Sequence, residues 1–160
     1  ATEVGKKIRN ILLDNKYNVS RISELMLYLA DRADHFEKFL KNSLTKNTIL
    51  VCDRYFESTF VYQVQLQKTI NKDQFSYLHN LIANNLKPDI TFLITSKFPH
   101  SLEKDRMENK MINRRQELID YYRQLKDMEL FNYPIKEIDT TNKKWKEYLD
   151  KIKNTMYHFI

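Results

Sequence analysis

The residues best suited to chemistry are Asp53, Arg54 and Tyr55, which directly follow the apolar run 49–52. A short run rich in β-branched residues, placed after a polar turn, predicts a buried strand of a parallel sheet. In an open α/β sheet the carboxyl ends of the strands face the ligand crevice, so these side chains would reach it. A carboxylate there can hold a metal ion, and a guanidinium beside it can clamp a phosphate. The alternative is a strand that simply ends in solvated charges.

A second polar set follows on a helix predicted over 55–67, and it consists of Ser58, Thr59, Tyr62 and Gln63. Ser58 and Tyr62 are four residues apart and therefore share a face. Neutral donors and acceptors of this kind suit an uncharged heterocycle, which must be recognised by hydrogen bonds.

A third candidate pair, Tyr28 and Arg32, lies on an amphipathic helix predicted over about 20–40, with Ser20 as its N-cap. The two side chains are four residues apart, so ring and guanidinium point the same way and could form a platform for a planar base. The alternative is an ordinary surface helix, in which Arg32 pairs with Asp31 or Glu24 and the tyrosine hydroxyl reaches solvent.

Basic residues gather in the stretch 97–115, which contains Lys97, Lys104, Arg106, Lys110, Arg114 and Arg115. Such a run can be no more than a solvated helix face. A basic segment directly after a strand is also where a phosphoryl-transfer enzyme would keep a closing lid.

The order of the predicted elements indicates an α/β fold. Helices are expected at 3–13, 20–40, 55–67, 73–86, 118–129 and 145–156, and strands at 49–52, 90–94 and 134–138. This order predicts a three-layer parallel sheet with helices on both faces and right-handed crossovers. Three strands are few for such a sheet, and the chain has 1 glycine where average usage gives roughly eleven. Because phosphate loops need glycine, we expect a strand and a glycine-rich segment to be missing from this stretch.

Composition narrows the function classes. The 160 residues are 42% hydrophobic and 30% charged, which suits one domain over 1–160 with a real core. No apolar run approaches the roughly 18 residues of a membrane span. The net charge of +6 favours anionic partners, whether nucleotides, phosphates or nucleic acid. The single Cys52 excludes an intrachain disulfide and fits a reducing cytoplasm.

Taken in order, these motifs resemble the thymidylate kinase family, nucleoside-monophosphate kinases of the P-loop class that make dTDP from dTMP and ATP. The blocks that carry the resemblance are 1–9 (ATEVGKKIR), 27–35 (LYLADRADH), 52–55 (CDRY) with the polar set after it, 88–91 (PDIT) and 105–108 (DRME). Each block is moderately specific, and their order makes the resemblance strong.

The resemblance assigns one group of residues to the nucleoside of dTMP. Tyr28 takes the place of an aromatic residue that stacks on thymine, and Arg32 that of an arginine that reaches an exocyclic oxygen of the base. Ser58 and Thr59 would contact the base edge. The residues expected along the deoxyribose and thymine side are Tyr62 and Gln63.

A second group is assigned to the phosphates and the transfer step. Arg54 would hold the dTMP phosphate, with help from Arg9, and Asp53 would act beside the phosphate and Mg2+. Arg106, with Lys104 nearby, would be the lid cation that neutralises charge as the ATP phosphoryl group moves. Asp53, Arg54 and Arg106 are thus the expected catalytic residues.

The chain also departs from the family pattern. The first strand and the Gly-x-x-x-x-Gly-Lys-Ser/Thr phosphate loop are absent, the lid at about 97–115 is short, and Val64 stands where a glycine usually follows the Tyr-Gln pair. The resemblance implies dTMP and ATP as substrates, a cytoplasmic homodimer, and neither membrane nor nucleic acid as a partner. Two alternatives stay open: a catalytically inactive kinase-like relative, and a basic nucleic-acid-binding helical domain that uses 97–115.

Overall fold

A computed structural model describes residues 2–45, 47–96, 114–142 and 144–158. The chain divides into two compact units, which we call the first unit (1–86 with 104–114) and the second unit (87–103 with 115–160). Within the described residues, no helix combines the length and the apolar character that a membrane span requires.

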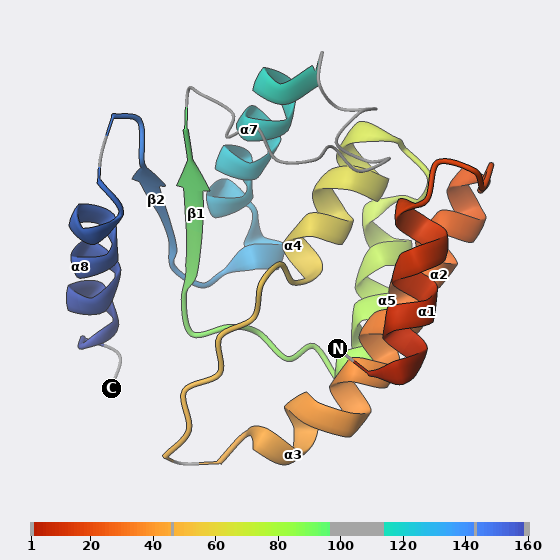
Figure 1. Ribbon diagram of the computed structural model, residues 1–160, viewed down its shortest axis with the longest axis horizontal. Coiled ribbons are helices and arrows are strands. Elements are labelled where there is room, and N and C mark those ends of the chain that lie inside the picture. Colours follow the sequence, from red (N-terminus) through yellow and green to blue (C-terminus); the bar gives the residue numbers. More distant parts are fainter. Residues whose placement is uncertain (1, 46, 97–113, 143, 159–160) are drawn as a thin grey trace. The chain divides into compact units, whose positions relative to one another are not determined.

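The described part of the first unit is helical (Figure 1). Its elements in chain order are α1 (Glu3–Leu13), α2 (Arg21–His35), the π-helix η1 (Phe36–Leu40), α3 (Lys41–Ser43), α4 (Phe56–Thr59), the π-helix η2 (Phe60–Leu66) and α5 (Lys72–Ala83). The predicted helices are therefore present, but two of them continue as π-helices rather than as uninterrupted α-helices.

Polar side chains fix where these helices begin. Thr2 Oγ1 accepts a hydrogen bond from Gly5 N at 2.8 Å at the start of α1, and Ser20 Oγ accepts from Ser23 N at 3.3 Å at the start of α2. Gly5 also lies close to α2, because a Cβ at this position would overlap Asp31 Oδ1. The glycine leaves room for this side chain, and its backbone does not have a positive φ.

The first unit is held together by large apolar side chains that several helices contribute. Its buried hydrophobic residues are Ile8, Leu12, Leu25, Leu29, Leu40, Phe56, Phe60, Val61, Leu66, Phe75 and Ala83. These positions repeat at helical spacing, which is why the sequence pattern located the helices correctly.

The strand predicted at 49–52 is wrong. The segment is extended but pairs with no strand among the described residues, and Figure 1 shows it as a plain trace between α3 and α4. Its side chains are exposed: 57% for Ile49, 39% for Leu50 and 87% for Val51. β-Propensity marks a segment that suits a sheet, but a strand forms only where a partner satisfies its backbone.

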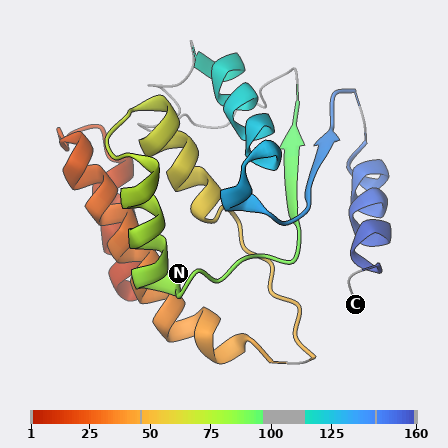
Figure 2. The same ribbon diagram turned by 180° about the vertical axis from the view of Figure 1, so that it is seen from behind.

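The described part of the second unit has a two-stranded parallel sheet (Figure 2). Its elements are β1 (Thr91–Thr95), α7 (Arg115–Gln124), the 3-10 turns η4 (Leu125–Asp127) and η5 (Glu129–Phe131), β2 (Ile135–Asp139) and α8 (Trp145–Met156). Thr91 pairs with Ile135 and Thr95 with Asp139. Both strands and α8 were predicted within one residue of these bounds.

Helices lie on both faces of this sheet. Arg123 of α7 binds Glu137 of β2, whereas the next residue, Ile138, lines a cavity together with residues of α8. Because successive strand residues point to opposite faces, α7 and α8 must cover different sides. This arrangement confirms the predicted three layers, on the two strands that the described residues contain.

Candidate functional site

Arg32 is the centre of a cluster in the first unit. Its Cζ lies 4.7 Å from the ring centroid of Phe56 and 5.6 Å from that of Tyr55. Its Nη2 donates a hydrogen bond to Thr59 Oγ1 at 3.4 Å. The structure therefore brings together two residues that the sequence placed in the same site from separate helices, Arg32 on α2 and Thr59 on α4.

The guanidinium of Arg32 is set up to receive an acceptor. Its Nε is buried and has no hydrogen-bond partner among the described residues, and no ion pair within them joins it to Asp31 or Glu24. Burial lowers the pKa of Arg32 from its ordinary value, with the nearby Cys52 and Tyr55 opposing the shift, but an arginine remains charged in proteins. A buried donor without a partner costs free energy, so an acceptor oxygen of a ligand would be stabilised here.

The guanidinium of Arg32 packs on a cluster of aromatic rings, which contains Tyr55, Phe56 and His79. The Phe56 ring lies 3.8 Å from the His79 ring, centroid to centroid, and meets Tyr55 edge-on at 5.0 Å. Tyr55 Oη donates to Leu86 O at 3.2 Å, and His79 Nε2 lies 3.2 Å from the same oxygen. Burial raises the pKa of Tyr55 to about 12, so its phenol stays protonated as a donor. The turn after Asp53 is thereby anchored to the end of α5.

Sequence reasoning did not assign His79 to the candidate site. The usable signal was the spacing of Phe75 and His79, which are four residues apart on the helix predicted over 73–86 and so share a face. Tyr55 was expected to face the ligand crevice, and instead its hydroxyl is bound within the protein.

Arg54 is the second cation of the site, and it stands on an unusual backbone. Its φ is 61°, in the left-handed region that costs a residue with a Cβ roughly 1 kcal/mol. Cys52 Sγ donates to Arg54 O at 3.3 Å. The Arg54 Cζ lies 6.0 Å from the ring centroid of Tyr62, so the exposed cation is next to a residue of η2.

The remaining predicted residues have less defined places. Tyr28 and Ser58 are half-buried, Asp53 is exposed at the turn before α4, and Gln63 is buried in η2. Arg9 is exposed on α1, and no contact between the described residues brings it to the cluster. Lys104 and Arg106 lie outside the described residues.

The described residues contain no group of three or more His, Cys, Asp or Glu side chains that could hold a metal ion. Asp53 therefore belongs to no such group. Mg2+ is commonly bound by one or two carboxylates together with substrate phosphates, and Asp53 fits that pattern only as one ligand among phosphate oxygens.

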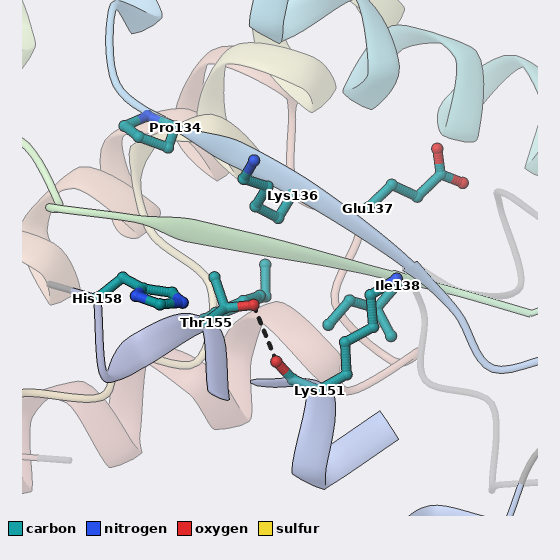
Figure 3. Close-up of a pocket in the computed structure, with 8 residues that line it drawn as sticks. Pro134, Lys136, Glu137, Ile138, Lys151, Thr155 and His158 are labelled. Carbon is teal, nitrogen blue, oxygen red and sulfur yellow. Dashed lines mark hydrogen bonds between the residues drawn. The ribbon is translucent and has the colours of Figure 1, made fainter. Parts of the chain in front are cut away.

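A cavity of about 580 Å³ lies elsewhere, in the second unit between the sheet and α8 (Figure 3). It is lined by Phe92 and Ile138 of the sheet and by Lys151 and Thr155 of α8, while Glu137 points away from it in the figure. Thr155 Oγ1 is already bound to Lys151 O at 2.9 Å. No predicted site residue borders this cavity, so we place the candidate site at Arg32 and Arg54.

Comparison with known protein families identifies one that matches most of the chain. The family model for thymidylate kinase matches residues 1–152. The chain belongs to the thymidylate kinase family. This confirms the resemblance that the sequence motifs suggested, and the match runs through both units from α1 into α8.

Several thymidylate kinases are similar to the chain. That of Sulfurihydrogenibium sp. (strain YO3AOP1) is 40% identical over 119 residues, which cover 69% of this chain and 57% of the relative. That of Thermosipho africanus (strain TCF52B) is 35% identical over 113 residues, covering 71% and 55%. The chain thus spans little more than half the length of these relatives.

Solved thymidylate kinase structures share the fold. The enzyme from Ehrlichia chaffeensis matches with a TM-score of 0.70 at 25% identity, over 97% of this chain and 75% of that one. The one from Candida albicans matches with a TM-score of 0.65 at 18% identity, over 100% and 75%, and supports the fold alone. The thymidylate kinase fold is thus present in this stretch, although its sequence holds no Gly-x-x-x-x-Gly-Lys-Ser/Thr motif.

Proposed function

We propose that this chain binds dTMP and presents the dTMP phosphate for phosphoryl transfer from ATP, which yields dTDP. The observation that carries the proposal is that the two cations of the site, Arg32 and Arg54, differ in their exposure to solvent. Arg32 is largely desolvated and has an unpartnered donor, whereas Arg54 is exposed. A neutral base with a carbonyl oxygen suits the first cation, and a phosphate dianion suits the second.

The base side of the site follows from α2 and α4. An exocyclic thymine oxygen accepts from Arg32, whose position is fixed by the Phe56 ring and by Thr59. Tyr28, one turn earlier on α2, stacks on the base, and Ser58 contacts its edge with Thr59. Neutral hydroxyls can select a base by hydrogen bonds without the desolvation cost of further charges.

The phosphate side follows from the turn before α4. Arg54 clamps the dTMP phosphate, Asp53 acts beside it with Mg2+ and phosphate oxygens as neighbours, and Arg9 assists. The deoxyribose, which joins base and phosphate, then lies along Tyr62 and Gln63. Phosphoryl transfer needs chiefly alignment and positive charge around the transferred group, which these residues supply for the acceptor.

The donor side is less complete in this stretch. Lys104 and Arg106 are proposed as lid cations that stabilise the moving phosphoryl group. A backbone cradle for the ATP phosphates needs a glycine-rich loop, and a sequence whose 1 glycine packs against Asp31 has none. The residues present therefore fit dTMP and do not fit the ATP phosphates by themselves.

We also propose a cytoplasmic homodimer. The exposed apolar pairs Ile22 with Met26 on α2 and Tyr77 with Leu81 on α5 are each four residues apart, so each pair forms a stripe along its helix. Four such side chains, between 48% and 68% exposed, suit a helix-packed interface between copies. Cys52 is a free thiol, which fits a reducing compartment.

Thermal shift separates this function from a nucleic-acid-binding domain. dTMP should raise the melting temperature at low and at high salt, whereas stabilisation by short DNA that disappears with salt would indicate a basic binding surface. A coupled assay with dTMP and ATP then separates an active kinase from an inactive relative. Absence of any dTMP stabilisation would overturn the proposal.

A further inference from the structure

Gln67, the residue directly after η2, joins that helix to the first turn of α2. Its backbone N donates to Tyr62 O at 2.9 Å, and its Nε2 donates to Glu24 Oε1 at 3.0 Å. Its carbonyl oxygen accepts from Arg21 Nη1 at 3.3 Å, and its Oε1 accepts from Thr69 Oγ1 at 3.4 Å. The backbone N and O of Gln67 and its side-chain Nε2 and Oε1 thus all form hydrogen bonds. We call the hydrogen bond between Glu24 and Gln67 the brace.

The brace is anchored on a buried charge. Glu24 is 1% exposed, and a carboxylate in such a place requires hydrogen-bond donors. It also lies in the first turn of α2, where the helix dipole favours negative charge. A hydrogen bond to an ionised group is about twice as strong as one between neutral groups. The contact with Gln67 is therefore a specific structural link rather than an incidental surface contact.

The brace acts on a helix that needs outside support. The bond from Gln67 N to Tyr62 O spans five residues, the pattern of a π-helix, and Thr69 N donates to Gln63 O at 2.7 Å. Lys68 between them has a φ of 53° and ends the helix. π-Helical turns are rare and occur mostly at functional sites. The carbonyls of both Tyr62 and Gln63 are thus held by the segment that the brace fixes.

Under the proposed function, the sugar of the bound nucleotide lies along Tyr62. Its ring neighbours Arg54, assigned to the phosphate, and Thr59, one turn earlier, is bonded to Arg32, assigned to the base. The deoxyribose connects those two ends, so a small shift of Tyr62 changes the space available to the sugar and its hydroxyl groups.

We propose that the brace is a positioning device for Tyr62, and that through it the chain sets its affinity for dTMP and its rejection of the 2′-hydroxyl analogue. This inference rests on the proposed function. Neither Glu24 nor Gln67 touches the substrate, and both act through the placement of η2. The sequence marks neither residue, because the contact joins positions 43 residues apart.

The test compares Gln67→Leu with a matched control, Gln65→Leu. Gln65 lies in the same helix, and its side chain forms no hydrogen bond with any other described residue, so the control repeats the chemical change without the brace. We expect Gln67→Leu to weaken dTMP binding roughly tenfold and to reduce the preference for dTMP over 5-methyluridine monophosphate. Gln65→Leu should leave both values near those of the wild type. Titration calorimetry with both nucleotides measures them.

Exchange of the two partners distinguishes positioning from simple destabilisation. In the double variant Glu24→Gln with Gln67→Glu, donor and acceptor change places, and both affinity and preference should recover. The inference is overturned if Gln67→Leu keeps the wild-type preference, if Gln65→Leu loses it equally, or if the exchange restores stability without restoring preference.

A wild-type chain that fails to bind dTMP would overturn the proposed function instead. Amide hydrogen exchange over 60–69 then tests the brace by itself, since Gln67→Leu should speed exchange of the η2 amides and Gln65→Leu should not. Equal protection in the two variants would contradict the brace.

Discussion

The two units of the chain differ in how their elements are joined. In the first unit, side chains from separate helices meet at defined polar contacts, such as Arg32 with Thr59 and Glu24 with Gln67. In the second unit the strands pair in register and Arg123 of α7 binds Glu137 of β2, but α8 has no buried residue and leaves a cavity of about 580 Å³ against the sheet. The proposed site lies in the first unit, where hydrogen bonds join separate helices, and the cavity of the second unit contains none of the residues assigned to that site.

The largest expected effect is on stability, and it comes from truncating one buried side chain in the core of each unit. Phe56→Ala should lower the free energy of unfolding by about 4 kcal/mol, because Phe56 is 1% exposed and packs against His79 and Arg32. Ile138→Ala should cost less, about 2 kcal/mol, although Ile138 is also 1% exposed, because its side chain is smaller than that of Phe56 and already borders a cavity. Urea denaturation measures both, and equal losses would remove the contrast in packing.

The next effect is on binding and belongs to the first unit alone. Arg54→Gly should weaken dTMP binding about 100-fold, or about 2.7 kcal/mol, and abolish turnover. Stability should hold or rise, because glycine accepts the φ of 61° without strain.

Asn142→Gly in the second unit is the control for that change. Asn142 has a φ of 57°, so the substitution gives the same backbone relief far along the chain from the cluster. It should leave dTMP affinity unchanged. Retained turnover in Arg54→Gly would exclude Arg54 from the mechanism.

A smaller effect tests the anchor between Tyr55 and Leu86. Tyr55→Phe should cost about 1 kcal/mol of stability, because Leu86 O keeps its contact with His79. The wild-type phenol has its pKa raised to about 12 by burial, from 10.0. Above pH 10 the unfolded chain releases this proton before the folded one does, so wild-type stability falls as the pH rises from 10 towards 12. Tyr55→Phe should lack this part of the alkaline loss, and equal slopes would place the phenol in water.

The smallest effect is at the ion pair between Arg123 of α7 and Glu137 of β2 in the second unit. Arg123→Met should cost about 0.5 kcal/mol at pH 7, because Arg123 and Glu137 are 46% and 34% exposed. The hydrogen bond from Arg123 lowers the pKa of Glu137 from 4.5. The pair therefore stabilises the fold above that value, and its contribution disappears as the pH falls through the lower pKa of the folded state. The difference between wild type and variant should shrink as the pH falls below 4.5, and a difference that stays constant as the pH is lowered further would indicate lost packing instead.

The sequence located most of the helices and strands, because the spacing of apolar residues and the preference of each residue for helix or strand act between residues that are close in the chain. Helical spacing of apolar residues placed α1, α2, α5 and α8, and short β-branched runs placed β1 and β2. The same rule failed at 49–52, because a run that suits a strand says nothing about whether a partner is present. The π-helical form of η2 was missed as well, since its i to i+5 bonds depend on contacts beyond the helix.

For the candidate site, too, some features could be predicted from the sequence and others could not. The amino-acid sequence by itself determined which residue types are available and in what order, which was enough to indicate the family, the pair Tyr28 and Arg32, and the Asp53-Arg54 turn. Only the tertiary structure decided that Arg32 rests on Phe56 with an unpartnered Nε, and that Gln67 ties η2 to Glu24. Burial and hydrogen bonding between distant segments have no periodic trace along the chain, because they depend on distances that exist only after folding.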